Sequence, residues 1–118
     1  MIEIYDRDGV PIGLEQFSEL SNDPSYSGIA LTTVMDASNP SIVFDVSTIW
    51  VGIAYPFGSA VPLIFETTIF GKGLSSDLVG SHYPTIADAR QGHMEIVASI
   101  AATLTDAIII DGYGEKES

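Results

Sequence analysis

Side chains that could do chemistry are few in this sequence, and histidine is the rarest of them. His82 and His93 are the two imidazoles, and Glu66 is a carboxylate inside an apolar, β-branched stretch. Imidazole nitrogens with a carboxylate oxygen form a ligand set that zinc accepts. A carboxylate in such a strand can also serve as a general acid or base with a raised pKa. Glu66 with His93 is therefore the candidate pair for a metal-dependent or acid/base hydrolase.

The pattern around these residues is incomplete for either chemistry. No H-E-x-x-H occurs, the two histidines lie on either side of an expected loop–helix boundary, and Asp45 is the nearest second carboxylate, with no fixed catalytic spacing. We therefore expect no catalytic residue, no metal and no cofactor. His93 falls on the apolar face of a predicted helix, where a hydrogen-bonded, half-buried histidine is usual. Glu66 is expected to face solvent or to pair with Arg90 or His93.

Three further motifs point to simpler readings. The segment 6–9, DRDG, lacks the ligands and glycine that a calcium loop needs downstream, and it predicts a turn. The segment 71–76, GKGLSS, lacks both the third glycine of a dinucleotide fingerprint and the Gly-Lys-Ser/Thr end of a P-loop. Ser47 and Ser59 lie in no G-x-S-x-G motif.

The charge balance excludes some classes of partner. The 118 residues include 16 acidic and 4 basic ones, a formal net charge of −12, and 46% are hydrophobic. So few cations disfavour binding to nucleic acid or an anionic membrane, and so much hydrophobic content disfavours disorder. The absence of cysteine excludes disulfides. With neither a signal peptide nor an apolar run long enough to span a bilayer, we expect a cytoplasmic protein.

The chain is predicted to be one α+β domain over residues 1–111, followed by a flexible acidic tail, 112–118. Its centre is a hairpin of strands 42–53 and 62–70, part of an antiparallel sheet of three to five strands. A short helix, 14–20, and a long one, 86–104, pack mainly on one face. Strands are also expected at 1–5 and 29–35 and a loop at 71–83, while 107–110 is either a last helical turn or an edge strand.

Particular side chains are assigned to the core by periodicity. Leu14, Phe17 and Leu20 form the apolar face of the first helix. Pro24 is expected to stop this helix, because it pushes Asp23 out of helical geometry. Thr85 is expected to cap the second helix, and Gly92 to mark close approach of that helix to the sheet. On the strand 29–35, Ile29, Leu31, Thr33 and Met35 are predicted to share one face. The strand 42–53 becomes apolar on both faces near residues 49–53, which makes a homodimer reasonable.

Three blocks of the sequence carry a resemblance. The first holds YDRDG at 5–9, PI at 11–12 and the residues Glu15, Leu20, Asp23 and Tyr26; the second holds VSTIWVGI at 46–53, FG at 57–58, PLIFET at 62–67 and Phe70; the third holds Tyr83, Thr85, Ala89, Gly92, His93 and Val97. In these blocks the chain resembles a family of small uncharacterised proteins of actinobacterial phages, prophages and their hosts. The second block is the most specific. The resemblance covers residues 5–97 and implies a viral or mobile-element setting without implying an activity. Related sequences often carry Asp-His where this chain has Ala54 and Tyr55.

These observations favour a non-enzymatic, phage-type accessory protein that binds a host or viral protein, for example in counter-defence with its acidic surface as the inhibitor. The alternative is a protein that binds or sequesters a small ligand such as a nucleotide, in a pocket between the hairpin tip and the loop 71–83. The tip aromatics resemble a recognition element. The candidate binding residues are Tyr55, Phe57, Glu66, Lys72, His82, Arg90 and His93.

Overall fold

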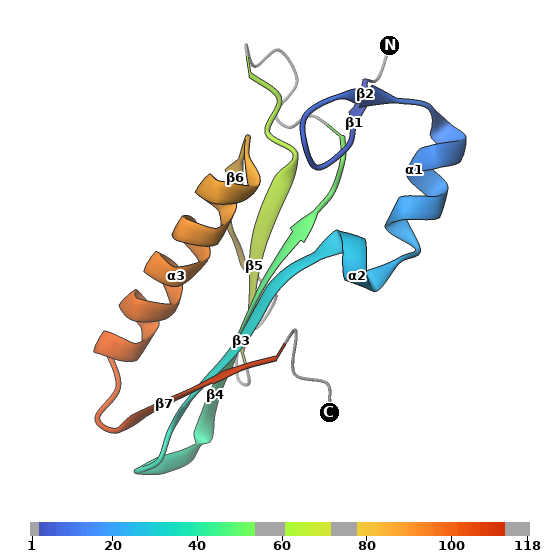
Figure 1. The fold of residues 1–118 in the computed structure, drawn as a ribbon. Helices are drawn as coiled ribbons and strands as arrows, with labels where there is room; N and C mark the ends of the chain where they lie inside the picture. The colour runs from blue at the N-terminus through green and yellow to red at the C-terminus, as the bar shows by residue number, and fades with distance from the viewer. Residues whose placement is uncertain (1–2, 54–60, 72–77, 113–118) are drawn as a thin grey trace.

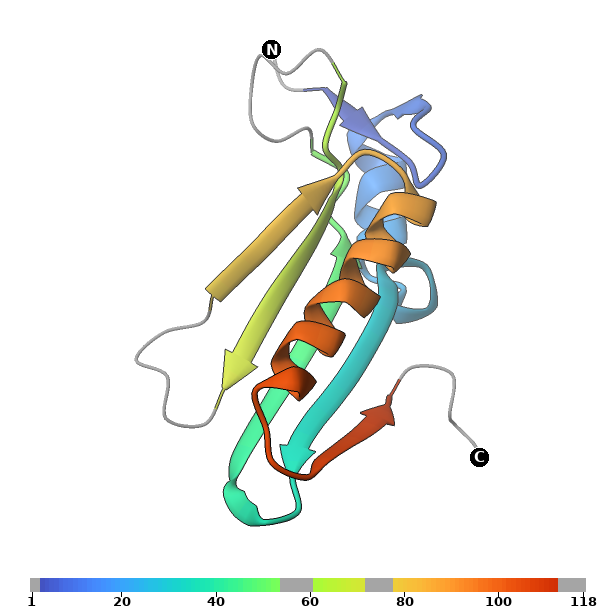
Figure 2. The same cartoon turned by 90° about the vertical axis from the view of Figure 1, so that its left-hand side faces the viewer.

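An antiparallel sheet with one long helix packed on one face forms the centre of the protein (Figures 1 and 2). The computed structural model describes residues 3–53, 61–71 and 78–112. Five strands lie in the order β6-β5-β4-β3-β7, each antiparallel to its neighbours. Their bounds are β3 Gly28–Asp36, β4 Asn39–Trp50, β5 Phe65–Gly71, β6 Leu78–Tyr83 and β7 Ala107–Asp111. The predicted two-layer α+β class is confirmed.

The predicted central hairpin is present as β4 and β5. Thr48 lies opposite Thr67 and Trp50 opposite Phe65, and all four side chains are buried. Val46 is buried on the same face of β4 as Thr48 and Trp50. β5 begins at Phe65 and not at residue 62. Just before it, the Ile64 carbonyl oxygen accepts the N–H groups of both Val51 and Gly52, so the pairing is irregular beyond the end of β4. The hairpin tip, 54–60, lies outside the described residues.

The sequence pattern of β3 did not decide which of its faces is buried. Thr32, Val34 and Asp36 are the buried residues of this strand, whereas Leu31, Thr33 and Met35 are only half-buried. Both faces of this strand are largely apolar or β-branched, so alternation alone fits either orientation. Small side chains on the Ala30–Thr32–Val34 side allow a helix to approach the strand closely.

The long helix, α3 Ile86–Ala102, covers one face of the sheet. Its N-cap is confirmed, because the Thr85 hydroxyl accepts the Asp88 N–H at 3.1 Å. The helix ends two residues earlier than predicted, where Thr103 caps it. The predicted close approach at Gly92 is also confirmed: a Cβ atom at this position would overlap the ring of Tyr83 on β6.

The segment 71–83 was predicted to be a loop, and its second half is instead the strand β6. Glu66 lies opposite His82 and Thr67 opposite Ser81, so β6 is held by pairing with β5. Gly80 and Ser81 have poor strand propensity, and the tertiary pairing outweighs it. Of the two alternatives for residues 107–110, the edge strand is correct, and β7 pairs with β3 over five residues in an unshifted register.

The N-terminal segment forms a small unit of its own. β1 Ile4–Tyr5 pairs with β2 Pro11–Ile12 across the predicted turn, where the Asp6 carboxylate accepts the N–H groups of Asp8 and Val10 at 2.9 Å. Gly9 has a φ of +83°, which favours glycine.

Two short helices follow this turn. The helix α1 Leu14–Ser21 is close to the range predicted, but Leu14 is 73% exposed and not part of the core. Pro24 was expected only to end a helix, and it instead begins a second one, α2 Pro24–Ser27. The Asp23 carboxylate caps α2 by accepting the Ser25 N–H at 3.0 Å. Proline suits this position because its missing N–H would have had no helical partner.

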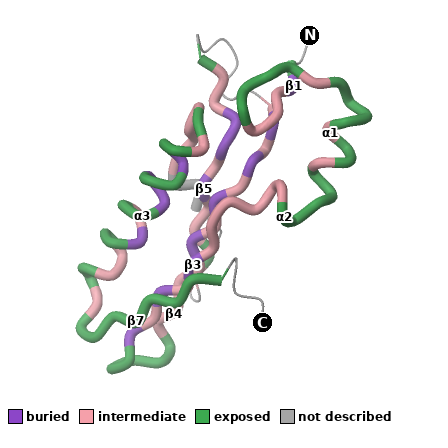
Figure 3. Tube along the Cα trace, in the orientation of Figure 1, coloured by how far each residue is buried: buried purple, intermediate pink, exposed green. Residues whose placement is uncertain are grey.

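Trp50 joins the N-terminal unit to the sheet. Its indole N–H donates to the carbonyl oxygen of Tyr5 at 3.0 Å, and its ring meets Phe17 and, edge-on, Tyr26 at centroid distances of 5.7 and 5.0 Å. Ile53 also bridges to Ile4. The end of β4 and the residues after it are thus tied to the N-terminal unit. Figure 3 shows buried positions along the central strands and the inner side of α3, with β7 exposed.

Candidate functional site

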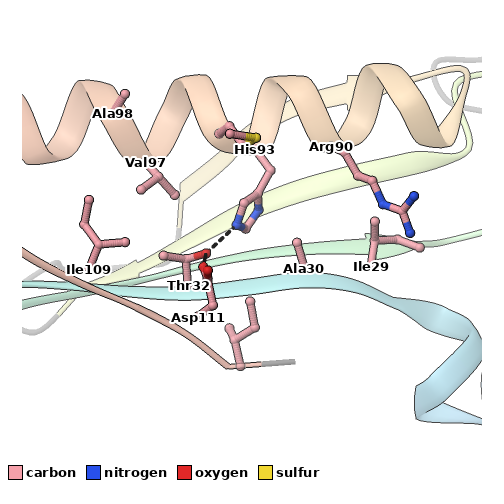
Figure 4. Close-up of a pocket in the computed structure, with 11 residues that line it drawn as sticks. Ile29, Ala30, Thr32, Arg90, His93, Val97, Ala98, Ile109 and Asp111 are labelled. Atoms are coloured by element: carbon pink, nitrogen blue, oxygen red, sulfur yellow. Dashed lines mark hydrogen bonds between the residues drawn. The ribbon is translucent and has the colours of Figure 1, made fainter. Parts of the chain in front are cut away.

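His93 lies at the centre of a buried polar network beneath α3. Its Nε2 is 2.8 Å from the Thr32 hydroxyl and its Nδ1 is 2.7 Å from the Thr48 hydroxyl. Thr48 in turn is 2.6 Å from the Thr67 hydroxyl, and Thr32 donates to the Asp111 carboxylate at 3.0 Å (Figure 4). His93 and Thr32 are each 3% exposed, and Thr48 and Thr67 are fully buried. The network links α3 to the strands β7, β3, β4 and β5.

The partners fix the direction of every hydrogen bond in this network. A carboxylate only accepts, so the hydroxyl hydrogen of Thr32 is committed to Asp111. The oxygen of Thr32 must then accept a proton from Nε2 of His93. A neutral ring carries one N–H, so Nδ1 accepts the hydroxyl of Thr48, and Thr48 accepts the hydroxyl of Thr67. The chain of donors therefore runs from Thr67 to Nδ1 and from Nε2 to Asp111.

The electrostatics of the site support a neutral imidazole. Burial lowers the pKa of His93 below its ordinary value, and the negative charge of Asp111 opposes that shift to a lesser degree. Both ring nitrogens are already satisfied, and a buried polar group is costly only when it lacks a partner. In this arrangement His93 is a structural link between helix and sheet, with neither nitrogen available to a substrate.

A groove of about 540 Å³ runs along the open side of this network, between α3 and the strands β3 and β7. In Figure 4, Arg90 lies toward one end, Val97, Ala98 and Ile109 toward the other, and the His93–Thr32–Asp111 chain between them. The walls are mainly hydrocarbon, and Met94 and Ile109 on its rim are 71% and 52% exposed. The lining residues are Ile29, Ala30, Leu31, Thr32, Arg90, His93, Met94, Val97, Ala98, Ile109 and Asp111.

Glu66 and His82 form a second, separate pair. They lie directly opposite each other on β5 and β6, with Nε2 of His82 3.2 Å from Oε2 of Glu66. The side chain of His82 is 19% exposed and that of Glu66 is 27% exposed. Because neighbouring residues of a strand point to opposite faces, Glu66 points away from the face on which Thr67 contacts the His93 network. The structure therefore does not bring Glu66 to His93 or to Arg90. The expected interaction of Glu66 with either residue is wrong, and its partner is His82.

The remaining predicted site residues are dispersed. Tyr55, Phe57 and Lys72 lie outside the described residues, so the pocket predicted between the hairpin tip and the following loop is not described. Arg90 and His93 are the predicted residues that the groove brings together. Within the described ranges, no cluster of three or more histidine, aspartate or glutamate side chains is suited to hold a metal ion. The helices in those ranges are also too short or too polar to cross a membrane.

Sequence reasoning identified His93 as a hydrogen-bonded histidine on the apolar helix face and missed its partners. Thr48 and Thr67 were not recognised as a buried pair opposite each other. Thr32 was not singled out, and Asp111 was assigned to the end of the domain without a role. The sequence did contain a signal for this network. A histidine and several threonines occur among apolar positions, and buried polar side chains of this kind need one another as hydrogen-bond partners.

No family model matches the chain, and searches of curated proteins and of solved structures find no similar protein. The site is therefore interpreted from its own geometry.

Proposed function

We propose that this protein acts by binding another protein, without catalysis, and that the groove between α3 and the β3–β7 edge receives an apolar segment of that partner. The observation that carries the proposal is this groove, with exposed apolar side chains on its rim in a strongly acidic chain. Exposed contiguous apolar surface beside a concavity is typical of protein contacts. A phage-type accessory role, such as counter-defence in a host cytoplasm, is supported by the sequence resemblance alone.

The side chains of the groove indicate the chemistry of the partner. Met94 is unbranched and polarisable, so it adapts to apolar side chains of different shape. Asp111 at the floor and the net charge of −12 favour basic residues flanking that apolar segment. The groove offers one cation, Arg90, which is exposed. A nucleotide, with several negative charges, is the weaker candidate for this reason, and a hydrolase using Glu66 and His93 is weaker still because the two side chains lie apart.

Selection of random peptides on the immobilised protein tests the proposal. We expect selected peptides with an apolar centre and basic flanks, and we expect Met94→Lys to weaken their binding at least tenfold. Ser99→Lys, on the same helix but outside the groove lining, is the matched control and should leave binding unchanged. If no peptide is enriched, or if Met94→Lys binds as well as Ser99→Lys does, the groove is not the binding site.

A further inference from the structure

The edge strand β7 has one unpaired, apolar edge of the kind that usually pairs with another strand. On one side it pairs with β3, and along its other side no described segment lies (Figure 2). Ile108, Ile109 and Ile110 are 40%, 52% and 49% exposed. Proteins usually protect an open edge with lysine, proline or a β-bulge. The strand Ala107–Asp111 contains no lysine or proline, and its pairing with β3 has no register shift.

The backbone of β7 presents an ordered set of donors and acceptors to this open edge. At the two ends of the strand, the Gly112 N–H donates to Leu31 O at 2.6 Å, and Asp106 O accepts the Ala37 N–H at 2.9 Å. In an antiparallel pair, hydrogen-bonded and non-hydrogen-bonded residue pairs alternate. The even-numbered residues of β7 therefore bond to β3. The N–H and C=O groups of Ala107, Ile109 and Asp111 point outward.

We propose that β7 pairs antiparallel with β7 of a second copy of this chain, with Ile109 opposite the partner's Ile109. In this register Ala107 lies opposite the partner's Asp111, and Asp111 opposite the partner's Ala107. All three outward-facing residues thus exchange backbone hydrogen bonds. A symmetric register centred on Ile108 or on Ile110 leaves only two such pairs, so the hydrogen bonds select the register centred on Ile109.

The side chains select a second copy over an unrelated strand. The register places the one charged residue of β7, Asp111, opposite an alanine, so the two strands meet without like charges face to face. On the face that points away from α3, Ile108 lies beside the partner's Ile110, and the symmetry repeats this contact. On the α3 face the two Ile109 side chains meet. Such self-complementarity is the requirement of a two-fold interface.

The dimer completes the groove. Ile109 is on the groove rim, and the partner's Ile109 would extend that apolar wall across the two-fold axis. The two grooves then become one trough bounded by the two α3 helices and floored by paired strands. The pairing itself does not depend on the proposed function, because it uses the edge of β7, whereas the peptide would occupy the face between α3 and β3.

Cysteine cross-linking tests the register, and the natural absence of cysteine leaves a clean background. In the proposed register Ile108 and the partner's Ile110 are a non-hydrogen-bonded pair with Cα atoms about 4.5 Å apart, within disulfide range. A mixture of Ile108→Cys and Ile110→Cys proteins should form a mixed disulfide dimer under mild oxidation. Ile108→Cys alone should not, because its own copy is a diagonal neighbour at about 7–8 Å. Equal cross-linking of Ile108→Cys alone and of the mixture would overturn the register.

Sedimentation equilibrium of the full chain at micromolar to millimolar concentrations tests the dimer. The wild-type chain should dimerise, and Ile109→Lys, which places two lysines face to face, should remain a monomer with an unchanged circular dichroism spectrum. Ala107→Lys should lower the dimer dissociation constant and Ala107→Asp should raise it, each by about two- to thirty-fold. The new side chain lies opposite the partner's Asp111, so lysine attracts and aspartate repels that carboxylate, and the two-fold axis repeats the pair. A wild-type monomer at every concentration, or the same constant for both Ala107 variants, would overturn the proposal.

Discussion

The two histidines lie on opposite sides of the sheet, and their surroundings differ. His93 belongs to α3 and points onto the covered face of the sheet, where it is buried and bonded on both ring nitrogens to threonine hydroxyls. His82, on the face that points away from α3, stays partly exposed beside Glu66. The same side chain is thus a link between layers in one place and a surface residue in the other. Its role is set by whether it lies between the helix and the sheet, and the residue type alone does not decide it.

Replacing each histidine in turn tests whether the buried one contributes more to stability than the partly exposed one. His93→Phe keeps a ring but leaves the Thr32 and Thr48 hydroxyls without their histidine partners, and it should lower the free energy of unfolding by about 2–4 kcal/mol. His82→Phe should change it by less than about 1 kcal/mol, because the contact is partly exposed. Urea unfolding of both variants measures this. Equal losses would show that the two faces do not differ as described.

The close approach of α3 to the sheet predicts a reversal of the usual effect at Gly92. In an ordinary helix interior, Gly→Ala gains about 1 kcal/mol. Here the new methyl group would overlap the Tyr83 ring, so Gly92→Ala should instead lose about 1–3 kcal/mol. Ser99→Ala, at an exposed position of the same helix, is the matched control and should be neutral or slightly stabilising. Thermal unfolding of the two variants gives the sign directly.

The direction of the hydrogen-bond chain predicts unequal effects for two neighbouring threonines. Thr48→Val removes the donor to Nδ1 of His93 and leaves a buried acceptor unsatisfied, a cost of about 1–3 kcal/mol. Thr67→Val leaves that donor in place, and Thr48 loses only the hydroxyl that donates to it. We expect Thr67→Val to cost about half as much as Thr48→Val. Chemical denaturation should rank the two, and a larger loss for Thr67→Val would reverse the assigned direction.

The pH dependence of stability gives the smallest effect and tests the neutral state of His93. Because the folded pKa is lowered by burial, the unfolded chain binds a proton first as pH falls below about 6.5. The contribution of the neutral His93 to the free energy of unfolding should be fully present above that pH. It should decline as the pH falls from there to the folded pKa, with a slope of at most about 1.4 kcal/mol per pH unit. The slope between pH 7 and pH 5 should be smaller in His93→Phe. An unchanged slope in that variant would mean that His93 is not the group responsible.

Much of the fold could be predicted, because its elements have local signals. Alternation identified the β4–β5 hairpin, and the Thr85 cap and the apolar stripe identified α3. The signals failed where two arrangements satisfied the same pattern. β3 is apolar or β-branched on both sides, so alternation did not decide its inward face. β6 contains Gly80 and Ser81, which have poor strand propensity, and its strand exists because β5 offers an edge to pair with.

The candidate site was predicted only in part, for a related reason. His93 was recognised from its place on a helical face, because that spacing is local. Its partners Thr32 and Thr48 lie 61 and 45 residues away from it in the sequence, and no local pattern joins them. Glu66 was expected to face solvent or to pair with Arg90 or His93, but the pleat of β5 turns it to the other face, where β6 brings His82 to it.

The sequence by itself determined the class of fold, the helix that covers the sheet, and the acidic, cysteine-free character that restricts the partners. Those properties depend on composition and on contacts between near neighbours in the chain. Only the tertiary structure decided that His93 bonds to threonines on both sides, that a groove opens beside it, and that β7 lies at an exposed edge. Each of these depends on which strand pairs with which and on which face the helix covers. Such choices are made by long-range packing and hydrogen bonding, which a local pattern does not encode.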